Sequence, residues 1–268
     1  MGSISGAEDD PRVTCQTDSE GVALIRITRP EKRNAMALSM WVTMGSLFRR
    51  LDDDPAVRCV ILTGDGGHFS AGADIAEFGE VRANAAQGLE YDRINDETTL
   101  AIRNCRKPAI AAISGVAVGG GLALALACDF RVADATARMG IPAGRLGLVY
   151  SVLDCRLLAE RVGVTHAKEI LFSGSIVGID DAARLGLIDR RAEGDVLGAA
   201  RTLAAEFTRN APLSIAGNKA ILNAIANGTA PGRMAELERW IADAFDSEDY
   251  AEGQRAFAER RAPRFTGR

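Results

Sequence analysis

Three consecutive glycines, Gly119 to Gly121, are the first residues of this sequence whose type and position suggest chemistry. They follow an apolar run, Ala109–Ile113, that is typical of a buried strand. A second apolar run comes after them, so we expect a helix to begin near Gly120 or Gly121. The first backbone N–H groups of a helix have no partner within it, and the helix dipole favours negative charge there. The pattern indicates donors aimed at an anion or at developing negative charge, although such glycines can also serve tight packing alone.

A second glycine-rich turn follows another predicted strand. The strand is Val57–Thr63, and the turn after it contains Ser70, Gly72 and Asp74. Because both turns follow strands, we expect them to lie side by side at one edge of a sheet. Ser70 lacks the G-x-S-x-G surround of a nucleophile elbow, and neither turn matches a phosphate-binding P-loop or a dinucleotide fingerprint.

The composition of the chain argues against several classes of function. The chain has 268 residues, is 47% hydrophobic and 25% charged, and carries a net charge of −4, which gives no reason to expect nucleic acid or a membrane surface as a partner. Five scattered cysteines without a C-x-x-C pair, two histidines and a polar N-terminus predict a cytoplasmic protein with reduced thiols and no metal. The uncharged run Ala109–Cys128 is long enough to consider a membrane span. Its three glycines, at about 1 kcal/mol each in a helix interior, make a continuous helix unfavourable.

The remaining patterns predict an alternating α/β body followed by helices. Residues 1–11 are expected to form a flexible N-terminus, residues 12–194 the core and residues 195–268 an all-helical region. The predicted strands are Arg12–Gln16, Val22–Thr28, Val57–Thr63, Ala109–Ile113, Phe130–Ala133, Arg138–Ile141 and Leu187–Asp189. The predicted helices are Ala37–Leu51, Gly88–Arg106, Ser151–Val162, Thr165–Phe172, Asp180–Leu185, Asp195–Asn210, Leu213–Ala226, Arg233–Asp246 and Asp249–Arg260. Residues 77–86 are expected to be polar and mobile.

Several segments, in order and at matching spacing, resemble the crotonase (enoyl-CoA hydratase/isomerase) superfamily along nearly the whole chain. They are Phe69–Ile75, Lys107–Gly115, Gly119–Gly121, Ala127–Asp129, Ala182–Ile188 and the C-terminal stretch Ser247–Phe265. The resemblance implies an α/β fold, a spiral of ββα turns with a C-terminal all-helical trimerisation region. It also implies a homotrimer, or a hexamer built as a dimer of trimers.

The same resemblance implies an acyl-CoA thioester as substrate, with coenzyme A entering as part of the substrate and no separate cofactor. The shared chemistry is the stabilisation of a thioester enolate by two backbone N–H groups, which by position are those of Ala73 and Gly120. By the same correspondence, the residues expected to bind the CoA moiety are Lys32, Arg33, Ala35, Ala71, Asp74 and Ile75, with Phe257 and Arg260 added in the site of a neighbouring subunit.

The chain departs from this family where hydratases carry two glutamates. Ala123 and Ala143 stand at those positions. Adding water to a double bond needs a general acid and a general base, and alanine supplies neither. Lyase chemistry of the decarboxylase type is therefore favoured over simple hydration, because loss of carbon dioxide itself generates the enolate.

Tyr150 is the residue expected to handle the departing carboxylate or the proton at the reacting carbon, since decarboxylases of the family carry a tyrosine at the same place. The alternative for Tyr150 is a packed aromatic ring, and in that case the proton-handling group is to be sought among Ser151, Asp154, Glu77 and Glu80. Ser151 is more simply the N-cap of the following helix, and Asp154 a carboxylate of its first turn.

Other functions stay open at this point. They are hydration or isomerisation with other acid–base residues, carbon–carbon hydrolysis by a retro-Claisen route, and a non-catalytic role in assembly. A panel of acyl-CoA substrates separates the enzymatic functions from the last one.

Overall fold

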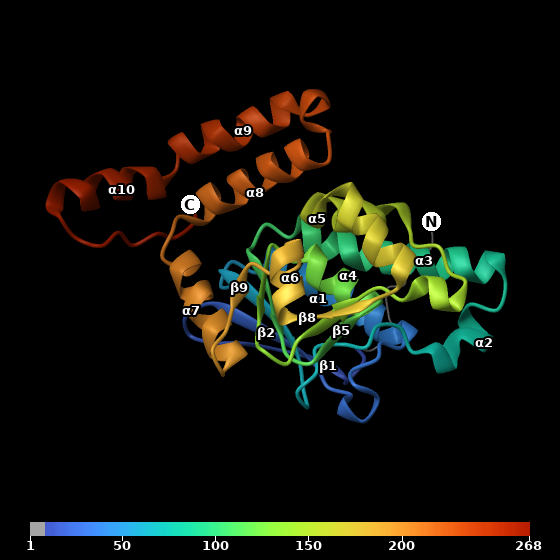
Figure 1. Cartoon of the computed structure of the whole chain (residues 1–268). Coiled ribbons are helices and arrows are strands. Elements are labelled where there is room, and N and C mark those ends of the chain that lie inside the picture. Colours follow the sequence, from blue (N-terminus) through green and yellow to red (C-terminus); the bar gives the residue numbers. More distant parts are fainter. Residues whose placement is uncertain (1–8) are drawn as a thin grey trace.

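The structure is a computed structural model that describes residues 9–268. It consists of an α/β body and an arm of three helices that projects from one side of the body (Figure 1). The α/β class expected from the sequence is confirmed. The expected flexible segment over residues 1–11 lies largely outside the described residues. At its end, Asp10 is held by the side chains of Arg12 and Ser39.

The main sheet forms the centre of the body. Its strands lie in the order β1 (Val13–Thr17), β2 (Val22–Ile27), β3 (Cys59–Gly64), β4 (Ala109–Ile113), β6 (Phe130–Ala133) and β9 (Arg190–Arg191). Only β1 and β2 pair antiparallel, and the other neighbours are parallel. The strands β3 and β4 are apolar on both faces, as expected for a parallel sheet that is covered on both sides.

Alternate residues of these strands face two different layers of helices. Leu62 and Ala111 belong to the core beneath α1 (Leu38–Asp53), α3 (Ala85–Asn104) and α4 (Gly120–Ala127). Ile61 and Ile110 belong to the opposite face, which α7 (Val196–Thr208) covers. Because α7 completes the sheet's covering, it is part of the body, and the arm begins after it.

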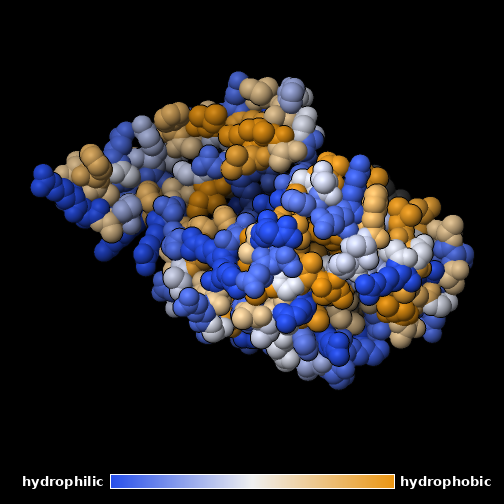
Figure 2. Space-filling view, viewed as in Figure 1, coloured by the Kyte–Doolittle hydropathy of each residue, from blue (hydrophilic) through white to orange (hydrophobic). Residues whose placement is uncertain are grey.

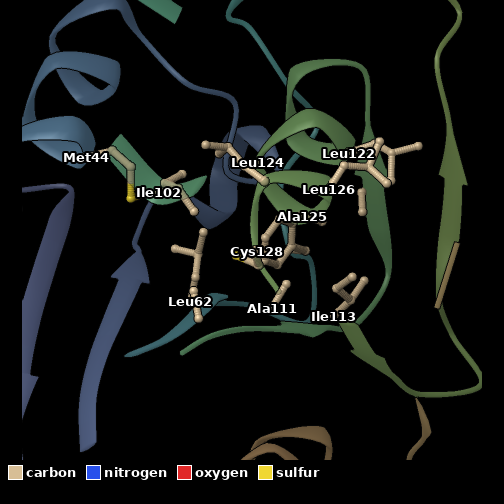
Figure 3. Packing of buried hydrophobic residues seen from close by; sticks show 14 of the residues in the cluster. Met44, Leu62, Ile102, Ala111, Ile113, Leu122, Leu124, Ala125, Leu126 and Cys128 are labelled. Carbon is tan, nitrogen blue, oxygen red and sulfur yellow. The ribbon is translucent and has the colours of Figure 1, made fainter. Parts of the chain in front are cut away.

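Helix α4 is buried on almost every side. All of its residues except Gly120 are buried, and none is charged. Figure 3 shows its leucines and alanines packed among Leu62, Ile102, Ala111 and Ile113. A helix that is apolar all round is stable only when it is enclosed in this way. This enclosure fixes the direction of α4, and therefore the place of its N-terminus.

A second, three-stranded sheet lies beside the first and is made of β5 (Val116–Val118), β7 (Arg138–Gly140) and β8 (Ile176–Gly178). Two parts of it correct the sequence analysis. The segment between β4 and α4, taken as a turn, contains the strand β5, where β-branched valines flank a buried alanine. The strand β8 was missed. In the main sheet, the strand predicted at Leu187–Asp189 lies instead at Arg190–Arg191.

The remaining helices of the body surround these sheets. Residues 77–86, expected to be mobile, contain the short helix α2 (Phe78–Val81). Helix α5 (Val152–Ser173) is broken at Gly163, where φ is 75°, so it corresponds to the two helices predicted on either side of that glycine. Ser151 caps α5 by accepting a hydrogen bond from the Asp154 amide at 3.1 Å, as predicted. Helix α6 (Ile179–Leu185) completes the body.

The arm contains α8 (Pro212–Ala226), α9 (Met234–Phe245) and α10 (Glu248–Glu259). Figure 2 shows apolar side chains gathered on its surface. Its large exposed apolar residues are Leu222, Ile225, Met234, Ile241, Phe245, Tyr250 and Phe257. Lys219 of α8 anchors the arm to the body through an ion pair with Asp129 at 2.7 Å.

Candidate active site

The two glycine-rich turns lie side by side, as the sequence predicted. Ser70 pairs in parallel with Ala117 of β5, and Ser70 N–H donates to the Val116 carbonyl at 2.9 Å. The approach is closest at Gly72, whose φ is 89°. A Cβ placed there would lie 2.6 Å from the Val118 oxygen and 2.9 Å from the Gly120 nitrogen, so no other residue fits this position without strain.

Backbone conformation and close packing explain the glycines before and in α4. Gly119 has a φ of 59°, which favours glycine. A Cβ on Gly121 would lie 2.3 Å from the Ser70 oxygen. The positive φ therefore accounts for Gly119 and tight packing for Gly121, and the N-terminus of α4 lies directly beside Ala73. A Cβ on Gly120 would lie 3.7 Å from the Ala73 nitrogen.

The N–H groups of Ala73 and Gly120 are both free to bind a ligand. Gly120 is the first residue of α4, so its N–H has no partner within the helix. The neighbouring amides of Asp74 and Gly119 donate to the carbonyls of Met36 and Gly140, but within residues 9–268 those of Ala73 and Gly120 have no acceptor. Both residues line one cavity of about 120 Å³. Two unpaired donors, one at the positive end of a helix, can bind one oxyanion.

The wall of this cavity comes from four parts of the chain. They are the turn after β3, the segment from α2 into α3, the N-terminus of α4, and the loop from Pro142 into α5. The lining residues are Ala71, Ala73, Ile75, Phe78, Arg82, Asp92, Asn95, Val118, Gly119, Gly120, Pro142, Ala143, Leu146, Leu148, Val149, Tyr150, Ser151 and Asp154.

The Tyr150 hydroxyl lies close to Gly119, the residue before the free N–H group of Gly120. A Cβ on Gly119 would lie 3.5 Å from the Tyr150 oxygen. Burial, together with the nearby carboxyl of Asp154, holds the Tyr150 pKa well above its usual value, so the hydroxyl stays protonated. Among the described residues, this hydroxyl makes no hydrogen bond, so it is available to a ligand.

Asp154 is a carboxylate of the first turn of α5 that also faces the cavity. Its Oδ1 is buried and has no hydrogen-bond partner within residues 9–268. Burial raises the pKa of Asp154 to about 7, and the negative charges of Asp96 and Asp92 add to that shift. A carboxyl group with a pKa near neutrality can both accept and donate a proton at physiological pH.

Asp92 and Asn95 of α3 also line the cavity. Asp92 forms an ion pair with Arg82 at 2.6 Å, and burial raises its pKa. The Arg82 guanidinium lies over the rings of Phe78 and Tyr91, 5.3 and 5.0 Å from their centroids. The positive charge of Arg82 is therefore already balanced by a carboxylate and stabilised by two aromatic faces.

Sequence reasoning missed this α3 wall. The signal that could have found it is the spacing of Asp92, Asn95 and Asp96. Residues three and four apart lie on one face of a helix. Asp96 reaches the other side of the site, where it accepts a hydrogen bond from the Ser151 hydroxyl at 2.8 Å.

The four residues named as alternatives for proton handling differ in their position relative to the cavity. Ser151 and Asp154 line the cavity, whereas Glu77 and Glu80 do not. Glu77 accepts a hydrogen bond from the Leu38 amide at 3.0 Å, at the start of α1. Ser151 is occupied as a helix cap and as a donor to Asp96. Ala143 forms part of the wall, and Ala123 is buried in α4.

The loop expected to bind the CoA moiety lies next to the turn that carries Ala73. The Ala71 amide donates to the Arg33 carbonyl at 2.9 Å, which joins the loop of Lys32, Arg33 and Ala35 to the turn after β3. Asp74 is buried and accepts from Lys32 at 2.8 Å. Ile75 is 56% exposed beside the cavity.

Phe257 and Arg260 lie apart from these residues within one chain. Both belong to the α10 end of the arm, which Figure 1 shows at the far side of the molecule from α2 and α3. Phe257 is 89% exposed and lines none of the cavity described above. If these two residues contribute to a CoA site, it is the site of another copy of the chain.

Within residues 9–268, no group of three or more histidine, cysteine, aspartate or glutamate side chains is placed to hold a metal ion. No helix in the same part of the chain combines the length and apolar character that a membrane crossing requires.

Comparison with known proteins decides the family. The family described as "Enoyl-CoA hydratase/isomerase" matches residues 17–268. The chain belongs to this family. A Bacillus subtilis relative named "Probable enoyl-CoA hydratase" is 35% identical over 248 residues, which are 92% of this chain and 95% of the relative. The "Short-chain-enoyl-CoA hydratase" of Clostridium acetobutylicum is 31% identical over 247 residues, 91% of this chain and 94% of that protein.

Solved structures agree with the sequence relatives. An enoyl-CoA hydratase/carnithine racemase from Magnetospirillum magneticum superposes with a TM-score of 0.89 at 33% identity, covering 97% of each chain. The crotonase-type fold expected for this enoyl-CoA hydratase/isomerase family member is therefore confirmed, and so is its membership of the crotonase superfamily. The chain is an acyl-CoA enzyme of this family.

Proposed function

We propose that the chain binds an acyl-CoA thioester and stabilises its enolate between the N–H groups of Ala73 and Gly120. The observation that carries the proposal is the pairing of two unpartnered backbone donors on one cavity, one of them at the N-terminus of α4. Fixed dipoles of this kind act on charge that develops during the reaction, and they do not have to reorganise. The CoA moiety is bound along Lys32, Arg33 and Ala35, and the proposal includes no cofactor besides it.

The route to the enolate does not use a pair of glutamates. The positions at which the family's hydratases carry them are Ala123 and Ala143 here. This favours lyase chemistry of the decarboxylase type, in which loss of carbon dioxide supplies the electron pair and Tyr150 orients the carboxylate or protonates the product carbon. The position of the Tyr150 hydroxyl at Gly119 supports that role.

A proton-transfer reaction is the second candidate, and Asp154 is the observation that favours it. Its buried carboxyl group offers an acid–base function at a position different from those of the two missing glutamates. Relatives whose names include "Short-chain-enoyl-CoA hydratase" and "Crotonyl-CoA hydratase" give this class of reaction further support.

Calorimetric titration with CoA and acetyl-CoA tests the proposed function first. Binding is expected, and no affinity up to millimolar ligand would refute it. A panel of malonyl-type and enoyl-type CoA substrates then identifies the reaction. Crotonyl-CoA hydration is expected to be slow, and a turnover equal to that of efficient hydratases would contradict the loss of the paired-glutamate mechanism.

We also propose that the chain assembles as a homotrimer or as a dimer of trimers through its arm. Support comes from the seven large apolar side chains that α8, α9 and α10 expose, since a surface of this kind marks an interaction site. Light scattering is expected to give the mass of a trimer or hexamer. A stable monomer at micromolar concentration would refute the assembly.

A further inference from the structure

Two buried side-chain oxygens on the cavity wall have no hydrogen-bond partner among the described residues, Asn95 Oδ1 and Asp154 Oδ1, and only that of Asp154 belongs to a group that can exchange a proton. Asp92, the other carboxylate on the cavity wall, is paired with Arg82 at 2.6 Å. Asp154 Oδ1, in contrast, is buried and has no partner among the described residues. A buried polar atom without a partner is costly, and such atoms in native structures call for a functional explanation.

The surroundings of Asp154 contain negative charge and little that offsets it. Asp92 and Asp96 face it from α3, and Tyr150 precedes it on its own segment. The packed helix α4 carries no charged residue at all. One turn further along α5, Arg156 and Glu160 pair with each other, and Glu160 also pairs with Arg103 of α3. Arg82 is the cation on the cavity wall, and it already forms an ion pair with Asp92.

We propose that Asp154 is the residue that moves the proton at the carbon next to the thioester, and that the acyl group it serves carries no carboxylate. The inference rests on the proposed function, because the thioester oxygen must first be held by Ala73 and Gly120. It also selects between the two candidate reactions, in favour of proton transfer.

The proton transfer needs no acid or base other than Asp154. Its carboxylate takes a proton from the carbon next to the thioester, and the electron pair of that C–H bond forms the enolate. The negative charge on the thioester oxygen lies between the N–H groups of Ala73 and Gly120. The protonated Asp154 then returns the proton either to the same carbon or, when the acyl group has a double bond between its third and fourth carbons, to the fourth carbon. The first outcome is exchange, the second is isomerisation, and Asp154 ends as a carboxylate in both.

The charge of the wall sets the substrate class. A malonyl-type acyl group would place its carboxylate in a cavity that Asp92 and Asp154 line, with Asp96 behind Ser151. Like charges at close range in a partly desolvated site repel strongly. An uncharged acyl or enoyl group meets no such repulsion. This substrate class differs from the one that the missing glutamates alone would favour.

Hydrogen–deuterium exchange tests the inference. The protein is incubated with butyryl-CoA in D₂O, and deuterium at the carbon next to the thioester is measured by mass spectrometry. The wild type is expected to catalyse exchange, with a rate that rises with pH through about 7 as Asp154 loses its proton. Asp154→Asn is expected to lower the rate at least about 100-fold and to abolish that pH dependence.

Controls separate the possible failures. Asp180→Asn makes the same chemical change at a carboxylate that is 85% exposed on α6, and it should leave the exchange unchanged. Asp154→Ser repeats the loss with a smaller side chain, and circular dichroism checks the fold of each variant. Calorimetry with CoA is expected to show equal affinity for all variants.

Two results would overturn the inference while leaving the proposed function intact. One is full exchange by folded Asp154→Asn. The other is a wild-type protein that decarboxylates methylmalonyl-CoA but exchanges no proton of butyryl-CoA. Absence of CoA binding in the wild type would instead remove the proposed function itself, and with it the inference.

Discussion

Replacing Asp154 by asparagine should stabilise the protein at alkaline pH. The pKa of this carboxyl group is raised from its ordinary value of 3.8 to about 7, mainly by burial. At about 1.4 kcal/mol per pKa unit, keeping the group ionised in the folded state costs at most about 4 kcal/mol. Asparagine has nearly the same shape and never ionises, so the variant avoids this cost.

The sign of the pH dependence follows from the direction of the shift. A folded-state pKa above the unfolded value means that the folded protein binds the proton more tightly. The stability contributed by Asp154 is complete below its unfolded pKa of 3.8 and is lost as pH rises through its folded pKa of about 7. The advantage of the variant should therefore grow as pH rises, from roughly a third of its full size at about pH 5 to its full size at about pH 8.5.

Thermal unfolding at these two pH values measures the effect. Asp154 is not fully enclosed, so the real cost is smaller than this maximum. We expect Asp154→Asn to raise the free energy of unfolding by about 1–3 kcal/mol at alkaline pH. This corresponds to a melting temperature several degrees higher for Asp154→Asn at alkaline pH, at roughly 2–4 °C per kcal/mol. Asp180→Asn serves as the control and should show no such pH-dependent gain. A variant that is less stable than the wild type at both pH values would mean that the Asp154 carboxylate makes stabilising contacts, and the reasoning would be wrong.

Three further substitutions test other parts of the account. Tyr150→Phe keeps the ring and removes the hydroxyl, and it should lower kcat at least about tenfold, or roughly 1.4 kcal/mol, on the identified substrate; full activity would leave the tyrosine a packing role only. Gly72→Ala places a Cβ 2.6 Å from the Val118 oxygen, so calorimetry should show weakened acyl-CoA binding and circular dichroism a lower melting temperature; unchanged values would refute the close-packing argument. Asp129→Asn leaves Lys219, whose side chain is 9% exposed, without its charged partner. It should cost about 3 kcal/mol of unfolding free energy in urea titration, and a loss below about 1 kcal/mol would mean that the pair does not anchor the arm.

The sequence predicted the strand, the helix start and the helix cap around the cavity because these features are local. The strand Ala109–Ile113 was correct to the residue, and the helix begins at Gly120 as expected. Ser151 was correctly predicted as an N-cap, since a cap depends only on residues within one turn. The placement of the two turns side by side also followed, because the carboxyl ends of parallel strands meet at one edge of a sheet.

What the sequence could not show depends on contacts between distant segments. The strand β5 is three residues long and exists because β7 and the turn at Ser70 pair with it, so a local pattern identifies it only as a bend. The charged wall of the cavity joins α3 to the start of α5. Nothing in the local sequence around Asp154 distinguishes a buried acid from an ordinary carboxylate in a first helical turn.

The most direct test of the account is the infrared spectrum of a bound thioester. Butyryl-CoA labelled with ¹³C at its thioester carbon is added to the protein, and the labelled carbonyl stretch is isolated by subtracting the spectrum of the unlabelled complex. Hydrogen bonds from both Ala73 and Gly120 polarise this carbonyl, so its stretch is expected to move to lower frequency on binding than in water. A ligand that binds with an unshifted carbonyl would show that these two N–H groups do not form an oxyanion site.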